Sequence, residues 1–88
     1  MVTVTIFGQG YQSPGDGGDI ESTMWLSDEE YEVIQSLAKK LDKDIDELSF
    51  YDLPDNLQER MEKVLNDDWG FQEGEKWNTF VNGFSIER

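Results

Sequence analysis

The sequence predicts an α+β domain in which two helices pack on one face of a small antiparallel sheet of about four strands, in the order β-β-α-α-β-β. Apolar and polar residues alternate near both ends of the chain, as strands with one buried face require. Two segments between them repeat apolar residues at three-to-four spacing, which is typical of helices with one buried side. The chain has 88 residues, so we expect residues 1–88 to form one small acidic domain.

The first two predicted strands cover residues 2–7 and 20–26, and we expect them to pair antiparallel. Their core-facing residues are Val2, Val4, Ile6, Met24 and Leu26. Residues 8–19 contain five glycines and Pro14, so this segment is predicted to be a long flexible loop.

Capping residues mark the start of the first helix. Ser27 is placed to be the N-cap and Glu30 the third helical residue, which together form a capping box. Leu26 and Tyr31 occupy the two positions of a hydrophobic staple. The predicted buried stripe is Tyr31, Ile34, Leu37, Ala38 and Leu41.

A connector over residues 42–52 is predicted to lead into the second helix. That helix opens near Asp52, has Pro54 in its first turn and ends around Asp67. The expected anchors of the connector are Ile45, Leu48 and Phe50. The predicted buried stripe of the second helix is Leu53, Leu57, Met61, Val64 and Leu65.

The last two predicted strands, 77–81 and 84–86, flank Asn82-Gly83. This dipeptide is typical of a two-residue hairpin turn. The alternative is that it forms a bulge within one longer strand. Residues 68–76 are aromatic but follow no regular pattern.

The charge of the chain limits its partners. It has 20 acidic and 7 basic residues, a net charge of -13, and residues 1–38 contain seven carboxylates and no lysine, arginine or histidine. Self-repulsion of this kind opposes compaction, but it favours solubility and attracts cationic surfaces. Direct binding to nucleic acid or to an anionic membrane is therefore not expected.

Composition also limits the chemistry. Without cysteine or histidine, thiolate and imidazole metal sites and His-dependent catalysis are excluded. The N-terminus has no basic region followed by an apolar run, and no apolar run is long enough to cross a membrane. We therefore expect a cytoplasmic protein that has no cofactor and is not an enzyme.

Two motifs resemble known sites only in part. Gly8-x-Gly10 follows a strand, but Ser13 stands where a dinucleotide-binding loop has its third glycine. The run of aspartates at positions 42, 44 and 46 resembles the opening of a calcium loop. An EF-hand would then need Gly and Glu where this chain has Glu47 and Leu53. Neither motif therefore predicts a site.

An acidic surface is the first candidate binding site. Its carboxylates are Glu21, Asp28, Glu29, Glu30 and Glu32. On a helix, neighbouring side chains lie about 5–6 Å apart, which is comparable to the spacing of phosphates along a nucleic-acid strand. Such an array would engage lysines and arginines that normally bind DNA or RNA. The alternative is that the charge only solubilises the protein.

The second candidate site is aromatic. Phe7 and Trp25 lie on the outward face of the first predicted hairpin, and aromatics rimmed by charge are typical of protein-binding hot spots. The alternative is that the loop or the C-terminal aromatics cover them, namely Trp69, Phe71 and Trp77.

These observations predict a small, non-enzymatic, protein-binding inhibitor that occupies a basic nucleic-acid-binding surface of a larger enzyme or nuclease complex by nucleic-acid mimicry. Anti-CRISPR, anti-restriction and nuclease-immunity proteins of phages or mobile elements form this functional class, by analogy of surface character. We expect a monomer, or a weak homodimer formed through an exposed strand edge at residues 1–7. The alternative is a structural or regulatory protein–protein interaction domain whose charge serves only solubility.

Overall fold

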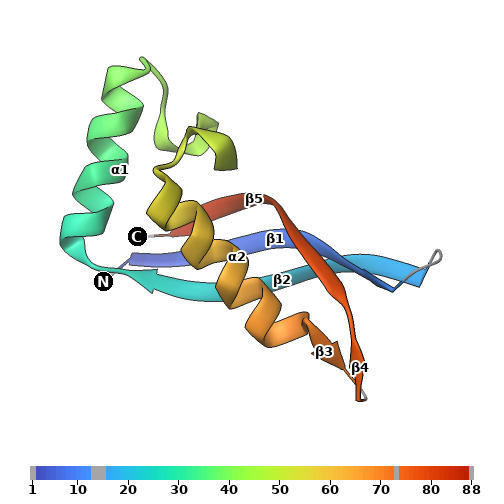
Figure 1. The fold of residues 1–88 in the computed structure, drawn as a ribbon. Helices are drawn as coiled ribbons and strands as arrows, with labels where there is room; N and C mark the ends of the chain where they lie inside the picture. The colour runs from blue at the N-terminus through green and yellow to red at the C-terminus, as the bar shows by residue number, and fades with distance from the viewer. Residues whose placement is uncertain (1, 13–15, 73, 88) are drawn as a thin grey trace.

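The computed structural model describes residues 2–12, 16–72 and 74–87, which contain a three-stranded antiparallel sheet and two α-helices (Figure 1). The bounds of these strands are Val2–Gln12 for β1, Asp16–Leu26 for β2 and Asn78–Glu87 for β5. Across the sheet the order is β2-β1-β5. The predicted α+β fold is confirmed.

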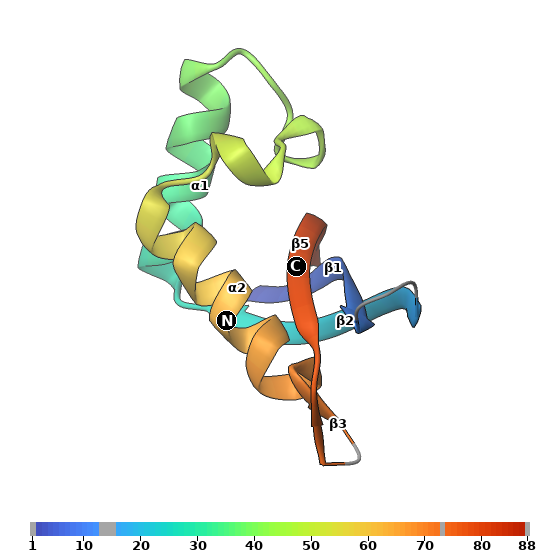
Figure 2. The ribbon, with the colours of Figure 1, turned by 45° about the vertical axis from the view of Figure 1, so that its right-hand side comes forward.

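The other elements are α1 Asp28–Lys40, η1 Ile45–Glu47, η2 Phe50–Asp52, α2 Asp55–Trp69, β3 Phe71–Gln72 and β4 Glu75–Lys76. Helix α2 crosses one face of the sheet, and α1 stands at the end of the sheet where β2 finishes (Figures 1 and 2). The short 3-10 helices η1 and η2 belong to the connector between the two helices. Strands β3 and β4 form a small separate hairpin after α2.

A single apolar core joins one face of the sheet to the helices. Val4 faces Met24 across the β1–β2 pair, and Val2 faces Leu26, as the alternation predicted. The most completely buried large side chains are Val4, Ile6, Leu26, Ile34, Leu57, Met61 and Leu65. Leu48 and Phe50 anchor the connector to the same core, as predicted. Leu41, at the end of the predicted stripe of α1, is instead 40% exposed.

The predicted loop over residues 8–19 is wrong for the part that the structure describes. Strand β1 continues to Gln12 and β2 begins at Asp16, while residues 13–15 lie outside the described ranges. Gly8 allows close packing here. A Cβ at Gly8 would stand 2.2 Å from the Phe80 carbonyl oxygen and 2.6 Å from Leu65 Cδ2, so glycine lets α2 approach the sheet.

The predicted hairpin at Asn82-Gly83 is also wrong, and its alternative is confirmed. Strand β5 runs unbroken from residue 78 to residue 87. Phe7 pairs with Gly83 and Gly8 pairs with Val81, so Asn82 is the extra residue of a β-bulge. Because β1 is eleven residues long, it offers pairing partners on both sides of the bulge.

Strand β1 lies in the centre of the sheet, between β2 and β5. The expectation of an exposed strand edge at residues 1–7 is therefore wrong for residues 2–7, the part of it that the structure describes. Strands β2 and β5 form the two edges of this sheet instead. The oligomeric state stays a prediction.

Candidate protein-binding face

The helices leave one face of the three-stranded sheet uncovered. We call it the open sheet face. Since side chains alternate along each strand, the positions on this face follow from the strand register. They are Thr3, Thr5, Phe7, Gln9 and Tyr11 of β1, Asp19, Glu21, Thr23 and Trp25 of β2, and Asn78, Phe80, Gly83, Ser85 and Glu87 of β5.

Four aromatic side chains are exposed on the open sheet face. Trp25 is 61% exposed and Phe7 is 42% exposed. Tyr11 and Phe80, also exposed, meet edge to face with their ring centroids 5.8 Å apart. The alternative that C-terminal aromatics bury Phe7 and Trp25 is therefore wrong. Exposed aromatic groups at this density are typical of binding surfaces.

Trp69 contacts the sheet at its edge strand β2. It packs against the core, and its indole Nε1–H donates to the Glu21 carbonyl oxygen over 2.8 Å. Arg60 makes a similar contact, because its Nη2 donates to the Trp25 carbonyl oxygen over 2.6 Å. Both donors belong to α2 and both acceptors to the backbone of β2. These bonds fix α2 against β2 while the side chains of Glu21 and Trp25 stay exposed.

The open sheet face carries negative charge, and the described residues of its three strands include no cation that compensates it. Strands β1, β2 and β5 contain no lysine or arginine. Asp19, Glu21 and Glu87 are exposed on this face, and Glu21 stands directly opposite Phe7 in the β1–β2 pair. Gln9 Nε2 donates to Asp19 Oδ1 over 3.5 Å. A face of this composition attracts cationic groups.

The start of α1 extends this negative charge, with Asp28 and Glu29 in its first turn and Glu32 in the next. Asp28, Glu29 and Glu32 are exposed, and α1 begins three residues after Trp25. Three residues span at most about 11 Å, so this acidic turn lies close to the Trp25 end of the open sheet face. Four of the five predicted carboxylates are thus exposed on the sheet or at the start of α1.

Glu30 differs from the other predicted carboxylates because its side chain bonds to other residues of the protein. Its Oε1 accepts the Ser27 backbone N–H over 3.0 Å, while the Glu30 N–H donates to Ser27 Oγ over 3.2 Å. This is the predicted capping box. Glu30 also pairs with Arg60 of α2. The Ser27 backbone N–H, and then the Arg60 guanidinium, hold the pKa of Glu30 below its ordinary value.

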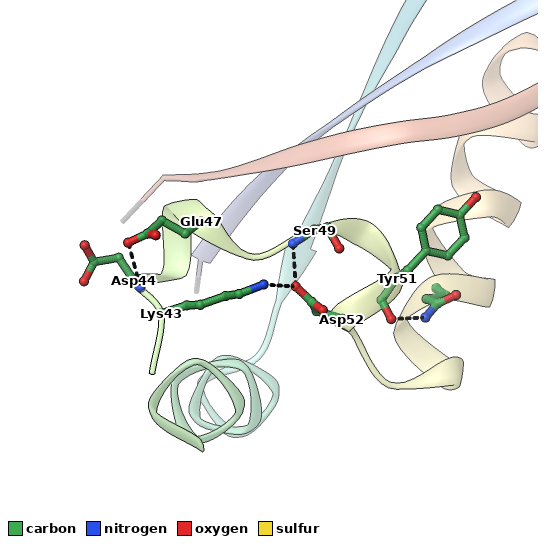
Figure 3. A network of polar contacts seen from close by, with 7 residues as sticks. Lys43, Asp44, Glu47, Ser49, Tyr51 and Asp52 are labelled. Carbon is green, nitrogen blue, oxygen red and sulfur yellow. Dashed lines mark hydrogen bonds and ion pairs between the residues drawn. The ribbon is translucent and has the colours of Figure 1, made fainter. Parts of the chain in front are cut away.

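The acidic connector serves the fold in a similar way (Figure 3). Asp52 Oδ2 accepts the Ser49 backbone N–H over 2.9 Å and pairs with Lys43 Nζ over 3.2 Å. The Ser49 bond, followed by Lys43, lowers the pKa of Asp52. Glu47 Oε1 accepts the Asp44 N–H over 3.3 Å. In the described residues, no three Asp or Glu side chains converge on a position for a metal ion.

Two hollows lie among the described residues. One, of about 610 Å³, is away from the open sheet face and is lined by Lys39 and Lys43 together with the acidic residues of the connector, so its charge is mixed. The other, of about 520 Å³, reaches the open sheet face, because its lining includes Phe7, Asp19 and Glu21 of that face beside Gly8, Ile20, Trp69 and Asn82. Neither helix in the described part of the chain combines the length and apolar character needed to cross a lipid bilayer.

Tyr11 and Phe80 are the two exposed aromatic residues of this face that the sequence analysis did not identify. The alternation of β1 continues through Gln9 to Tyr11, and following it past Gly8 would have placed Tyr11 beside Phe7. No family model, curated protein or solved structure matches the chain. The composition and geometry of the open sheet face are therefore the basis for a functional proposal.

Proposed function

We propose that this protein is a small, non-enzymatic inhibitor that binds a basic nucleic-acid-binding surface of a larger enzyme or nuclease complex. The observation that supports it is the open sheet face, where exposed aromatics stand among carboxylates on three strands that contain no basic residue. A partner that fits such a face has a cationic surface with apolar patches between its charged groups. Surfaces that bind nucleic acid have this character.

Inhibition would follow from occupancy alone. Glu29 and Glu32 are neighbours one turn apart on α1, about 5–6 Å from each other, and Glu21 adds a carboxylate from the sheet. The partner's lysines and arginines would pair with carboxylates in place of phosphates, and there would be no bond for a nuclease to cleave. By analogy of surface character, this proposal assigns the protein to the functional class of anti-CRISPR, anti-restriction and nuclease-immunity proteins. We place the activity in the cytoplasm, where such nucleases work.

A second candidate is a structural or regulatory interaction domain in which the charge serves only solubility. The observation that favours it is the exposure of four aromatic rings on one face, with Trp25 61% exposed. In that case apolar contact would supply the affinity, and binding would respond little to salt.

Affinity capture from lysate of the source organism, or of the bacterium that its mobile element infects, tests the proposal. We expect one basic nucleic-acid-binding protein or nuclease complex to be retained at low salt and released by an excess of DNA or RNA oligonucleotide. Release would mean that nucleic acid and this protein compete for one surface. Retention that neither oligonucleotide nor high salt disturbs would contradict the inhibitor proposal and favour the interaction domain.

Two variants of equal net charge test whether the capture depends on the acidic surface. The site variant is Glu21→Gln, Glu29→Gln and Glu32→Gln. The control variant is Asp46→Asn, Glu59→Gln and Glu62→Gln, which changes exposed carboxylates of η1 and α2. Each changes the net charge from -13 to -10 (-13 + 3). We expect the site variant to lose capture and the control to keep it. Equal behaviour of the two variants would contradict a specific acidic surface.

A further inference from the structure

We propose that the open sheet face contains an acceptor for an arginine side chain of the partner, formed by Glu21, Phe7 and Gly83. This inference rests on the proposed function in taking the partner to be a basic protein. It goes further by naming the group that is bound and the place where it binds.

The three residues form one row across the sheet. Phe7 of β1 pairs with Glu21 of β2 on one side and with Gly83 of β5 on the other. Directly opposite residues of an antiparallel pair have Cβ atoms about 4.5–5.5 Å apart. The Glu21 carboxylate is therefore within one side-chain length of the Phe7 ring.

The ring of Phe7 is open on the side of β5. Gly83 contributes no side chain there, and a Cβ at this position would meet no heavy atom within 4 Å. Phe7 is 42% exposed, and among the described residues it makes no ring contact. Phe7 thus has a carboxylate residue beside it on β2 and free space beside it on β5. We call this arrangement the trough.

A guanidinium group fits this trough better than an ammonium group. Its plane stacks on an aromatic face while its N–H groups bind a carboxylate in bidentate fashion. Within the described residues, the three strands contain no cation that would compete, and Arg60 is engaged by Glu30 and by the Trp25 carbonyl.

The other exposed aromatics of this face are less suited. Trp25 stands opposite Thr3 instead of a carboxylate. Tyr11 and Phe80 contact each other edge to face, which covers part of each ring. Only the Phe7 row combines an uncovered ring, a directly opposite carboxylate and an empty neighbouring position among the described residues of this face.

The glycine supplies a test that spares the carboxylate. Gly83→Leu would place a side chain in the trough, with no clash at its Cβ and no left-handed backbone, because no heavy atom stands within 4 Å of that Cβ. Gly18→Leu is the matched control: its Cβ would also meet nothing within 4 Å. Gly18 lies opposite Gly10, on the other face of the sheet. Circular dichroism and thermal unfolding would verify that both variants fold.

The probe is a short peptide of alternating glycine and arginine, titrated into ¹⁵N-labelled protein at low salt, beside the same peptide with lysine. We expect the arginine peptide to shift the amide signals of Phe7, Glu21 and Gly83, and to bind about tenfold more weakly to Gly83→Leu and to Glu21→Gln. Gly18→Leu should bind as the unaltered protein does, and the lysine peptide more weakly.

Unchanged binding to Gly83→Leu, equal binding of the two peptides, or shifts spread evenly over all exposed carboxylates would each overturn the acceptor. Its failure is distinct from failure of the proposed function. If Gly83→Leu leaves peptide binding unchanged but nucleic acid still releases the captured partner, the acceptor is overturned and the proposed function stands. If the peptide binds specifically but no captured partner is released by nucleic acid, the acceptor stands and the proposed function is overturned.

Discussion

Glu30 shows how one residue can belong to a pattern of surface acids and still act inside the fold. Its spacing from Ser27 predicted the capping box, which the structure confirms. The pairing with Arg60 could not be predicted in the same way, because the two residues are thirty positions apart and lie on different helices. Local geometry follows from sequence spacing, whereas this contact depends on where α2 lies.

Glu30→Gln should destabilise the protein by about 1 kcal/mol at neutral pH, since a half-exposed pair contributes no more than that. Folding lowers the pKa of Glu30 from 4.5, so its contribution is present above that value. It is lost as pH falls through the folded-state pKa. Urea denaturation of both proteins from pH 7 downward should show the stability difference shrinking below pH 4.5. A difference that stays constant with pH would contradict this account.

Gly8 and Gly83 should respond in opposite ways to a methyl group. Gly8→Ala would push against the Phe80 carbonyl oxygen at 2.2 Å and against Leu65, and overpacking of this kind costs about 1–3 kcal/mol. Gly83→Ala meets nothing within 4 Å, so we expect a neutral or slightly stabilising effect. Thermal unfolding of the two variants checks this. A tolerated Gly8→Ala would mean that α2 does not press on the sheet there.

At the scale of elements, the sequence predicted both helices and the first parts of β1 and β2, because their apolar periodicity is regular. The prediction was wrong at glycines, because a glycine can mark a loop or turn but can also lie in a strand where packing leaves no room for a side chain. Residues 8–12 and 16–19 are rich in glycine, which suggested a loop, but they form strand. Glycine is present there for packing: a side chain at Gly8 would collide with Leu65 of α2, and one at Gly17 would collide with Tyr11. Asn82-Gly83 suggested a turn because this dipeptide is typical of two-residue hairpin turns. Only the register with β1 identifies it as a bulge.

Deletion of Asn82 distinguishes the bulge from a hairpin turn. Because Phe7 pairs with Gly83 and Gly8 with Val81, removing Asn82 leaves a regular ladder on both sides. We expect the variant to fold with only modest loss of stability. Deletion of Ser85, within the regular part of β5, should destabilise far more, because a one-residue shift moves side chains to the opposite face. Equal losses in chemical denaturation would contradict the bulge.

At the scale of the whole molecule, charge dominates. The two shorter dimensions are 22 and 20 Å, whereas the Debye length is about 30 Å at 0.01 M salt and about 8 Å at 0.15 M. At low salt the field of all the carboxylates therefore extends beyond the protein and guides a cationic partner. At physiological salt only the carboxylates nearest the partner still contribute. Position on the surface then matters more than the total charge.

The sequence predicted part of the candidate site. Phe7, Glu21 and Trp25 were identified from the alternation of two short strands, and they share the open sheet face. Phe80 and Gly83 could not be assigned to this face from sequence, because their position depends on how β5 pairs with β1. The row of Glu21, Phe7 and Gly83 joins β1 and β2, which are consecutive in the chain, to β5 near its C-terminal end. Strand register in space, which single-chain periodicity does not determine, creates this row.

The most direct test of the central claim is the association rate constant of the captured partner, measured by surface plasmon resonance at low and physiological salt. The compared proteins are the unaltered chain, the site variant (Glu21, Glu29 and Glu32 to Gln) and the control variant (Asp46 to Asn, Glu59 and Glu62 to Gln). The account predicts about a tenfold or greater slowing for the site variant, and a near-normal rate for the control at physiological salt. Equal slowing of both variants, or of neither, would contradict it.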